Sequence, residues 1–261
     1  MFEQVGRYRI LGVESVLRLR SGQALRQRAG HIGDVYRARD TRAGRTVTIA
    51  ILPETLTADA DRRRGLFRAA NAAATLSHPN IAALYEIGDD HGRVFLAFEF
   101  VRGETLRSAI GGQPMNARRA LDLGAQIAGA LAEASRAGIV HRATLDTIVV
   151  TPTGHAKLLY VGVAPWLSPA THDQAVADAD SMADVRNVGT LLFEMLTGAP
   201  PNGAPLSSIS AALPRQVDAI VAKALADRAV DRYASAAALA ADLRRAVAAI
   251  DARRAAIERR Q

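Results

Sequence analysis

The stretches GHIGDVYRARD (residues 30–40) and VTIAIL (residues 47–52) carry most of the information about the fold of this 261-residue chain. The first keeps the glycines Gly30 and Gly33, and the second is an uncharged run with Ala50 at its fourth position. Lysine is nearly absent, since only Lys157 and Lys223 occur. Further stretches extend the pattern along the chain: LFRAANAAATLSHPNIAALYEIGDDHGRVFLAFEFVRGETL (66–106), GIVHRATLDTIVV (138–150), KLLYVG (157–162) and DADSMADVRNVGTLLFEMLTG (178–198).

In this order, the stretches resemble the characteristic segments of bacterial-type serine/threonine protein kinases: the glycine-rich loop, the V-A-I-K strand, the αC helix, the catalytic loop, the D-F-G strand and the αF helix. The match is collinear over nearly the whole chain. It implies an α+β, bilobal protein kinase-like fold, in which a small antiparallel β-sheet N-lobe with its αC helix precedes a mainly helical C-lobe. We expect the N-lobe over residues 1–101, the C-lobe over 102–250 and a basic helical tail over 251–261.

The resemblance fails at the charged and metal-binding positions of the family's catalytic machinery. In chain order, the phosphate-gripping lysine, its αC glutamate, the catalytic aspartate, the magnesium-binding asparagine and the D-F-G aspartate fall on Ala50, Ala69, Ala143, Thr147 and Tyr160. Phosphoryl transfer depends on positioning and on charge neutralisation through magnesium. Neutral Thr and Tyr side chains cannot form a normal carboxylate magnesium site. Losing one such electrostatic group typically costs about 10²–10³ in rate, so we expect transfer near background.

Few other residues offer a replacement for these groups. Asp146 is the only acid in the predicted catalytic loop. It is either a displaced general base, which would need hydrogen-bond reach to the substrate, or an ordinary loop residue without an evident partner. Lys157 precedes the Y-V-G turn and Lys223 lies in a late predicted helix, so neither is expected to reach phosphates.

The resemblance also implies a vestigial nucleotide pocket. Its residues would be the loop glycines, the adenine-pocket walls and the hinge backbone: Gly30, Gly33, Val35, Thr48, Phe98, Glu99 and Val101. Thr48 replaces a small alanine, Phe98 is a bulky gatekeeper, and Tyr160 would project toward the phosphate and metal site. We therefore expect no cofactor, with weak, metal-independent ATP binding left open.

Residues with structural roles in the family are kept. His141 and Arg142 begin the H-R-D motif, Asp184 matches the αF aspartate that holds the catalytic loop, and Arg232 matches a structural arginine whose usual glutamate partner is here Ala170. The αF stretch repeats apolar residues at helical spacing and ends at a capping glycine: Val185, Val188, Leu192, Met195, Leu196 and Gly198.

Two changes in length distinguish the chain from the family pattern. Only residues 163–165 separate Gly162 from Trp166, so the activation loop, which is ordered by phosphorylation in active kinases, is nearly deleted. Conversely, residues 15–27 are extra length with repeated Leu-Arg doublets. This insertion is either a basic arm that covers the cleft or binds an acidic partner, or a tolerated surface loop.

Composition limits the function classes. The chain has no cysteine, which excludes disulfides and thiolate metal sites, and its six histidines show no ligand-like spacing, so no metal site is expected. The net charge of +7 is spread among acids and accompanies no nucleic-acid motif, so we expect no nucleic-acid partner. No apolar run has the length of a membrane span and no signal-peptide pattern appears, which makes a cytoplasmic location the expectation.

The sequence therefore predicts a pseudokinase, a regulatory or scaffolding module that binds an unidentified protein partner. The alternative is an ATP-binding serine/threonine kinase with displaced catalytic residues. A third interpretation, a decayed kinase without function, stays open at this point.

Overall fold

The computed structural model describes residues 3–13, 34–139, 141, 143–167, 181–209 and 214–259. Its N-terminal part is built on one antiparallel sheet with the strand order β1-β2-β3-β4-β6-β5. The strands are β1 Gln4–Val5, β2 Tyr8–Val13, β3 Asp34–Asp40, β4 Arg45–Ile51, β5 Leu84–Asp90 and β6 Arg93–Glu99. The buried carboxylate of Asp40 closes the β3–β4 turn, since it accepts the backbone N–H groups of Arg42 and Ala43 at 3.0 Å each.

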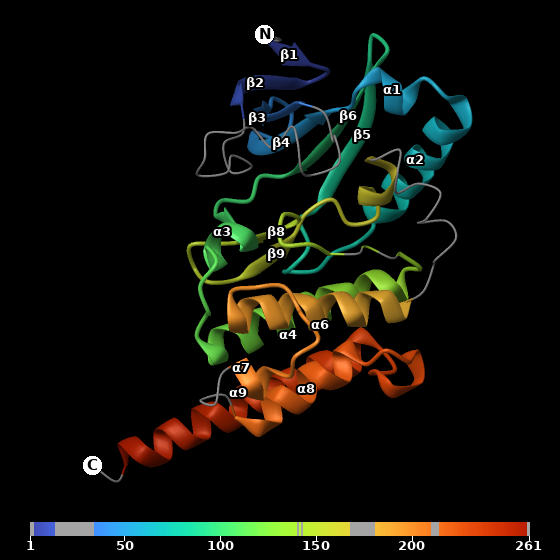
Figure 1. Ribbon diagram of the computed structural model, residues 1–261. Helices are drawn as coiled ribbons and strands as arrows, with labels where there is room; N and C mark the ends of the chain where they lie inside the picture. Colours follow the sequence, from blue (N-terminus) through green and yellow to red (C-terminus); the bar gives the residue numbers. More distant parts are fainter. Residues whose placement is uncertain are drawn as a thin grey trace.

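Two helices follow β4: α1 Glu54–Thr57, which contacts α2, and α2 Ala60–Ala73, which packs beside β5 of the sheet (Figure 1). Asp59 caps the N-terminus of α2 by accepting the backbone N–H of Arg62 at 2.7 Å. Leu66 and Ala70 of α2 belong to the same buried cluster as Leu96 of β6. An ion pair between Arg63 and Asp89, 2.5 Å long, ties the helix to the end of β5.

The C-terminal part is mainly helical, with α3 Leu106–Ile110, α4 Ala117–Arg136, α6 Ser181–Thr197, α7 Leu206–Ile209, α8 Arg215–Leu225 and α9 Ala236–Glu258. The 3-10 turns η2 Ala164–Leu167 and η3 Ala229–Asp231 and a small sheet complete it, with strands β7 Glu104–Thr105, β8 Ile148–Val150 and β9 Ala156–Leu158. Helices α4, α6 and α9 share one core, and a Cβ on Gly124 of α4 would lie 2.5 Å from Leu192 of α6. The predicted α+β fold with a β-rich and a helical lobe is confirmed.

The two lobes are joined by direct hydrogen bonds as well as by the chain. Leu158 of β9 donates its N–H to the carbonyl of Asn80 and accepts the N–H of Ala82, both at 2.8 Å. The Asn80 side chain donates to the side-chain oxygen of Gln126 on α4 and to the carbonyl of Ala156. The loop between α2 and β5 is therefore fixed to the C-terminal lobe.

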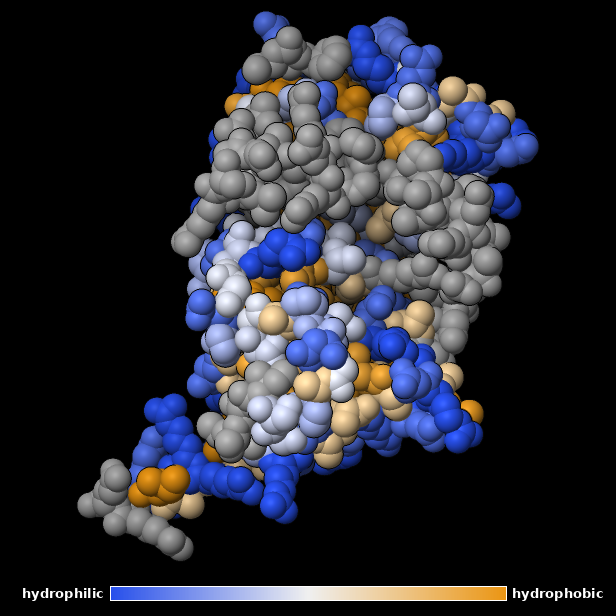
Figure 2. All heavy atoms as spheres, in the orientation of Figure 1, coloured by the Kyte–Doolittle hydropathy of each residue, from blue (hydrophilic) through white to orange (hydrophobic). Residues whose placement is uncertain are grey.

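The last turns of α9 project from the body as a mostly hydrophilic surface (Figure 2), and Ile257 in this segment is 60% exposed. This is the region that the sequence predicts as a basic helical tail. Among the helices within the described ranges, none has both the length and the apolar character needed to cross a bilayer.

Candidate functional site

Ala50 lies near the C-terminal end of β4, where it pairs with Val35 of β3 and with Leu96 of β6. It is fully buried and belongs to the main core cluster together with Leu66 and Ala70 of α2. A methyl group thus stands where the resembled family has an ammonium group. The strand contributes packing at this point and no charge.

Ala69, at the position of the paired glutamate, lies on α2. It is half-buried and shares one helix face with Gly65 and Ala73, because these residues are four apart. All three residues are small, so the row presents little more than backbone and methyl groups. Ala50 and Ala69 together therefore replace an ion pair by two methyl groups.

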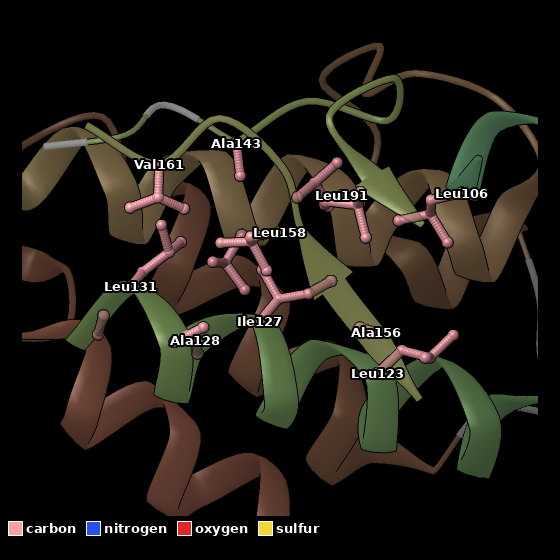
Figure 3. Close-up of a cluster of buried hydrophobic side chains, with 14 of the residues drawn as sticks. Leu106, Leu123, Ile127, Ala128, Leu131, Ala143, Ala156, Leu158, Val161 and Leu191 are labelled. Carbon is pink, nitrogen blue, oxygen red and sulfur yellow. The ribbon is translucent and has the colours of Figure 1, made fainter. Parts of the chain in front are cut away.

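Ala143, at the position of the catalytic aspartate, is buried. Figure 3 shows its methyl group in the hydrophobic cluster with Val161, Leu158 and Leu131. A carboxylate in this cluster would lose its hydration, which strongly disfavours the charged form. In this chain the position therefore belongs to the buried core.

Thr147, at the position of the magnesium-binding asparagine, closes a turn of the loop. Its Oγ1 accepts the backbone N–H of Thr144 at 2.9 Å and lies 3.2 Å from the Thr144 carbonyl, to which it donates. The hydroxyl is thus used locally. These two hydrogen bonds hold the turn between Thr144 and Thr147.

The prediction that Asp146 has no evident partner is wrong. Its two carboxylate oxygens accept Nε and Nη2 of Arg107 at 2.8 Å each, and Arg107 also donates its backbone N–H to the carbonyl of Leu145. The hydrogen bond to Asp146 raises the pKa of the Arg107 guanidinium. The reason is that α3 begins directly beside the loop, so a residue 39 positions away supplies a bidentate partner.

Tyr160, at the position of the D-F-G aspartate, has a left-handed backbone (φ +60°) and is buried. Its ring meets Phe98 of β6 edge to face, with 5.1 Å between the ring centroids and 81° between the planes. Such aromatic pairs stabilise their contact beyond the area they bury. An aromatic pair therefore joins the two lobes where the resembled family places a metal-binding carboxylate and its gatekeeper.

The other predicted pocket residues lie close to this pair in the sheet. Thr48 of β4 is buried and pairs with Phe98 of β6, and Val35 of β3 is half-buried against the main core. Val101 forms a small separate cluster with Ala82 and Val149, against which Leu159 packs. The sequence analysis did not include Val149 and Leu159 among the pocket residues. Val149 follows the predicted catalytic loop and Leu159 directly precedes Tyr160, so their positions in the sequence could have indicated that they lie next to the predicted pocket.

Glu99, the predicted hinge residue, is held by Lys157 of β9. Their charged groups are 2.7 Å apart, and Lys157 also donates to the carbonyl of Ile81 at 3.3 Å. Lys223 lies with Nζ 4.5 Å from the centroid of the Tyr233 ring. Lys157 is thus paired with the predicted hinge residue, and Lys223 packs on an aromatic ring. That neither serves phosphates stays a prediction.

The residues expected to have structural roles are buried or bound to backbone. His141 is 1% exposed, neither ring nitrogen has a hydrogen-bond partner within the described part of the chain, and burial lowers its pKa to about 4. Asp184 is 2% exposed in the first turn of α6. Arg232 donates to the carbonyls of Ala226 and Asp227 at 2.6 and 2.8 Å and so closes the end of α8.

Several predicted positions lie outside the described residues: Gly30, Gly33, Arg142, Ala170 and the insertion at 15–27. Within the described ranges, no three His, Asp or Glu side chains come together in a group that could hold a metal ion. At the five positions of the family's charged and metal-binding groups, the chain carries methyl, hydroxyl and phenol side chains. It offers no charge at the positions that would neutralise a triphosphate.

Residues 29–174 match the family model described as the protein kinase domain. The chain is 30% identical over 257 residues to the serine/threonine-protein kinase PknB of Mycobacterium tuberculosis, covering 82% of this chain and 41% of PknB. It is 30% identical over 273 residues to the serine/threonine-protein kinase PrkC of Bacillus subtilis, covering 91% and 41%. The chain thus spans about two-fifths of the length of these relatives.

A solved structure supports the fold independently. The crystal structure of the Mycobacterium tuberculosis PknI kinase domain superposes with a TM-score of 0.72 at 23% identity. The superposition covers 94% of this chain and 99% of the PknI chain. At this level of identity, the similarity concerns the arrangement of the backbone.

Proposed function

The chain belongs to the protein kinase family, and from this premise we propose that it is a catalytically inactive member, a pseudokinase that acts as a regulatory or scaffolding module for another protein. One observation carries the proposal. The family's charged and metal-binding positions hold Ala50, Ala69, Ala143, Thr147 and Tyr160, and the structure gives these residues packing and turn contacts instead.

The energetic argument follows from what phosphoryl transfer needs. The protein must hold magnesium and neutralise charge that develops on the transferred group, and it must position the nucleophile. When catalytic residues act together, the rate losses from replacing each of them do not simply add. Here, however, all five charged or metal-binding residues of the set are replaced. We propose that catalysis falls to background and that nucleotide binding, if any, is weak and independent of metal. A kinase-like fold without these activities can still bind another protein through its surface, and this is the function we propose.

The second candidate is an active serine/threonine kinase with displaced catalytic groups. Its support is that relatives such as PknB and PrkC bear the name of serine/threonine kinases. Asp146 is the acidic residue of the predicted catalytic loop and so the candidate for a displaced base, but both of its carboxylate oxygens accept hydrogen bonds from Arg107. A general base needs a lone pair within hydrogen-bond reach of the substrate hydroxyl, and here both carboxylate oxygens already accept hydrogen bonds from the guanidinium.

A phosphotransfer assay tests the proposal. Purified protein with labelled ATP, magnesium or manganese, and generic protein substrates should give no transfer above a control without enzyme. Autophosphorylation that disappears in Asp146→Asn but persists in Asp227→Asn, an exchange at an exposed carboxylate, would establish the second candidate instead.

Nucleotide binding is a separate expectation with its own readout. Because Tyr160 packs on Phe98 and no metal-binding carboxylate stands at this position, ATP with magnesium should leave the melting temperature unchanged. Thermal denaturation with ATP, in the presence and absence of magnesium, measures this. A magnesium-dependent rise of several degrees at micromolar ATP would contradict it, because only ligands with real affinity for the folded state produce such a shift.

A further inference from the structure

The short segment that follows β9 makes an unusually close contact with α2. The Trp166 indole lies directly over Gly65: a Cβ placed on this glycine would be 2.2 Å from Cη2 and 2.3 Å from Cζ3 of the ring. Arg62, one turn earlier on α2, donates from Nη2 to the carbonyl of Trp166 at 3.1 Å. The helix therefore holds both the ring and the backbone of this residue.

A second contact lies farther along the same helix face. A Cβ on Gly162 would be 2.9 Å from the Cβ of Ala73, so the backbone of the Y-V-G turn rests against the end of α2. Gly65 and Ala73 are eight residues apart, or about 12 Å along the helix axis. The segment from Gly162 to Trp166 thus runs along two turns of α2. The gold turn of η2 lies beside α2 in Figure 1.

The segment is itself tightly folded. Val163 and Ala164 both donate their N–H groups to the carbonyl of Tyr160, at 3.1 and 2.9 Å, and Trp166 donates to the carbonyl of Val163 at 2.9 Å. Gly162 adopts φ +79°, a conformation that side chains rarely allow. The near-deleted activation loop is therefore a compact structural unit in this chain.

We propose that residues 160–166 form an internal clamp, which docks on the small-residue face of α2 at Gly65, Ala69 and Ala73 and fixes that helix in one position. Ala69, the site of the missing glutamate, lies one turn from each of the two contacts on this face. A small residue there leaves room for the segment to approach. The clamp thus takes over the positioning of α2 from the absent ion pair, and it needs neither nucleotide nor metal. The clamp consists of contacts within the chain, so its existence does not depend on whether the chain is catalytically active.

The exchange Gly65→Ala tests the clamp by the sign of its effect. Alanine stabilises an unobstructed helix relative to glycine. At position 65, however, the added methyl collides with Trp166, so we expect the urea midpoint to fall by about 0.5 M. Trp166 is the only tryptophan of the chain, so its fluorescence reports on the contact directly. Its emission should shift to longer wavelengths, and quenching by acrylamide should increase.

A matched control variant and a second sequence background separate the Gly65–Trp166 collision from the general effect of replacing glycine by alanine in a helix. In Gly129→Ala on α4, the new Cβ meets only the tip of the Arg244 side chain at 3.1 Å, so the midpoint should stay or rise with unchanged emission. In a Trp166→Ala background the collision is gone, and Gly65→Ala should now raise the midpoint. If Gly65→Ala raises the midpoint in both backgrounds and leaves the emission of the otherwise native protein unchanged, the clamp does not exist.

Discussion

Replacing Asp184 with alanine should lower the free energy of unfolding by about 3 kcal/mol, the largest loss we expect from a single side chain around the candidate site. The carboxylate is 2% exposed and lies in the first turn of α6, where the positive end of the helix dipole favours it. From the resemblance to the family, we expect it to accept backbone N–H groups of the loop that contains His141. Its removal would leave buried donors without an acceptor.

Asp146→Ala is the matched control, because it removes a carboxylate from the same loop region. Its side chain is 14% exposed, but its partner Arg107 is 45% exposed and can turn to water. We therefore expect a loss of about 1 kcal/mol, in the range of partly exposed ion pairs. Urea denaturation of the two variants measures the difference. A loss at Asp146 equal to or larger than that at Asp184 would mean that the loop has been assigned to the wrong residues.

The sequence predicted the fold because the information needed is local and periodic. The apolar residues Val185, Val188, Leu192, Met195 and Leu196 recur at helical spacing, and all are buried in α6. Gly198 follows this helix with φ +79°, as a capping glycine should. Such signals lie within a few residues of one another and survive the loss of catalytic groups.

The contacts that define the site could not be predicted in the same way. Arg107 and Asp146 are 39 residues apart, and Arg62 and Trp166 are 104 apart, so no short pattern links them. Ala143 carries no signal of burial, because alanine is tolerated both inside and outside a protein. The sequence showed which charges are missing, but only the structure shows what packs in their place. Tyr160, at the position of the D-F-G aspartate, packs on Phe98. Trp166 packs on α2, the helix that lacks the family's glutamate.

Acid should destabilise the protein through His141, by about 3 kcal/mol between neutral pH and pH 4. Burial lowers the pKa of His141 to about 4 in the folded state, whereas an unfolded chain has a histidine pKa near 6.5. Below pH 6.5 the unfolded state therefore binds the proton first. The stability is fully present above this value and is lost as the pH falls toward 4. Burial also lowers the pKa of His78, which adds a contribution of the same sign.

Urea denaturation across this pH range in His141→Leu tests the assignment. The variant should lose most of the pH dependence, because leucine fills the buried site without a group that can be protonated. His155→Leu, an exchange at an exposed histidine, is the control and should keep the full slope. The buried carboxylate of Asp40 does not account for this pH dependence. Burial acts to raise the pKa of Asp40, but the N–H groups of Ala43 and Arg42 and the Arg7 side chain outweigh it, so that its contribution is lost only at lower pH. A slope that is unchanged in His141→Leu would show that this histidine binds its proton without unfolding the core.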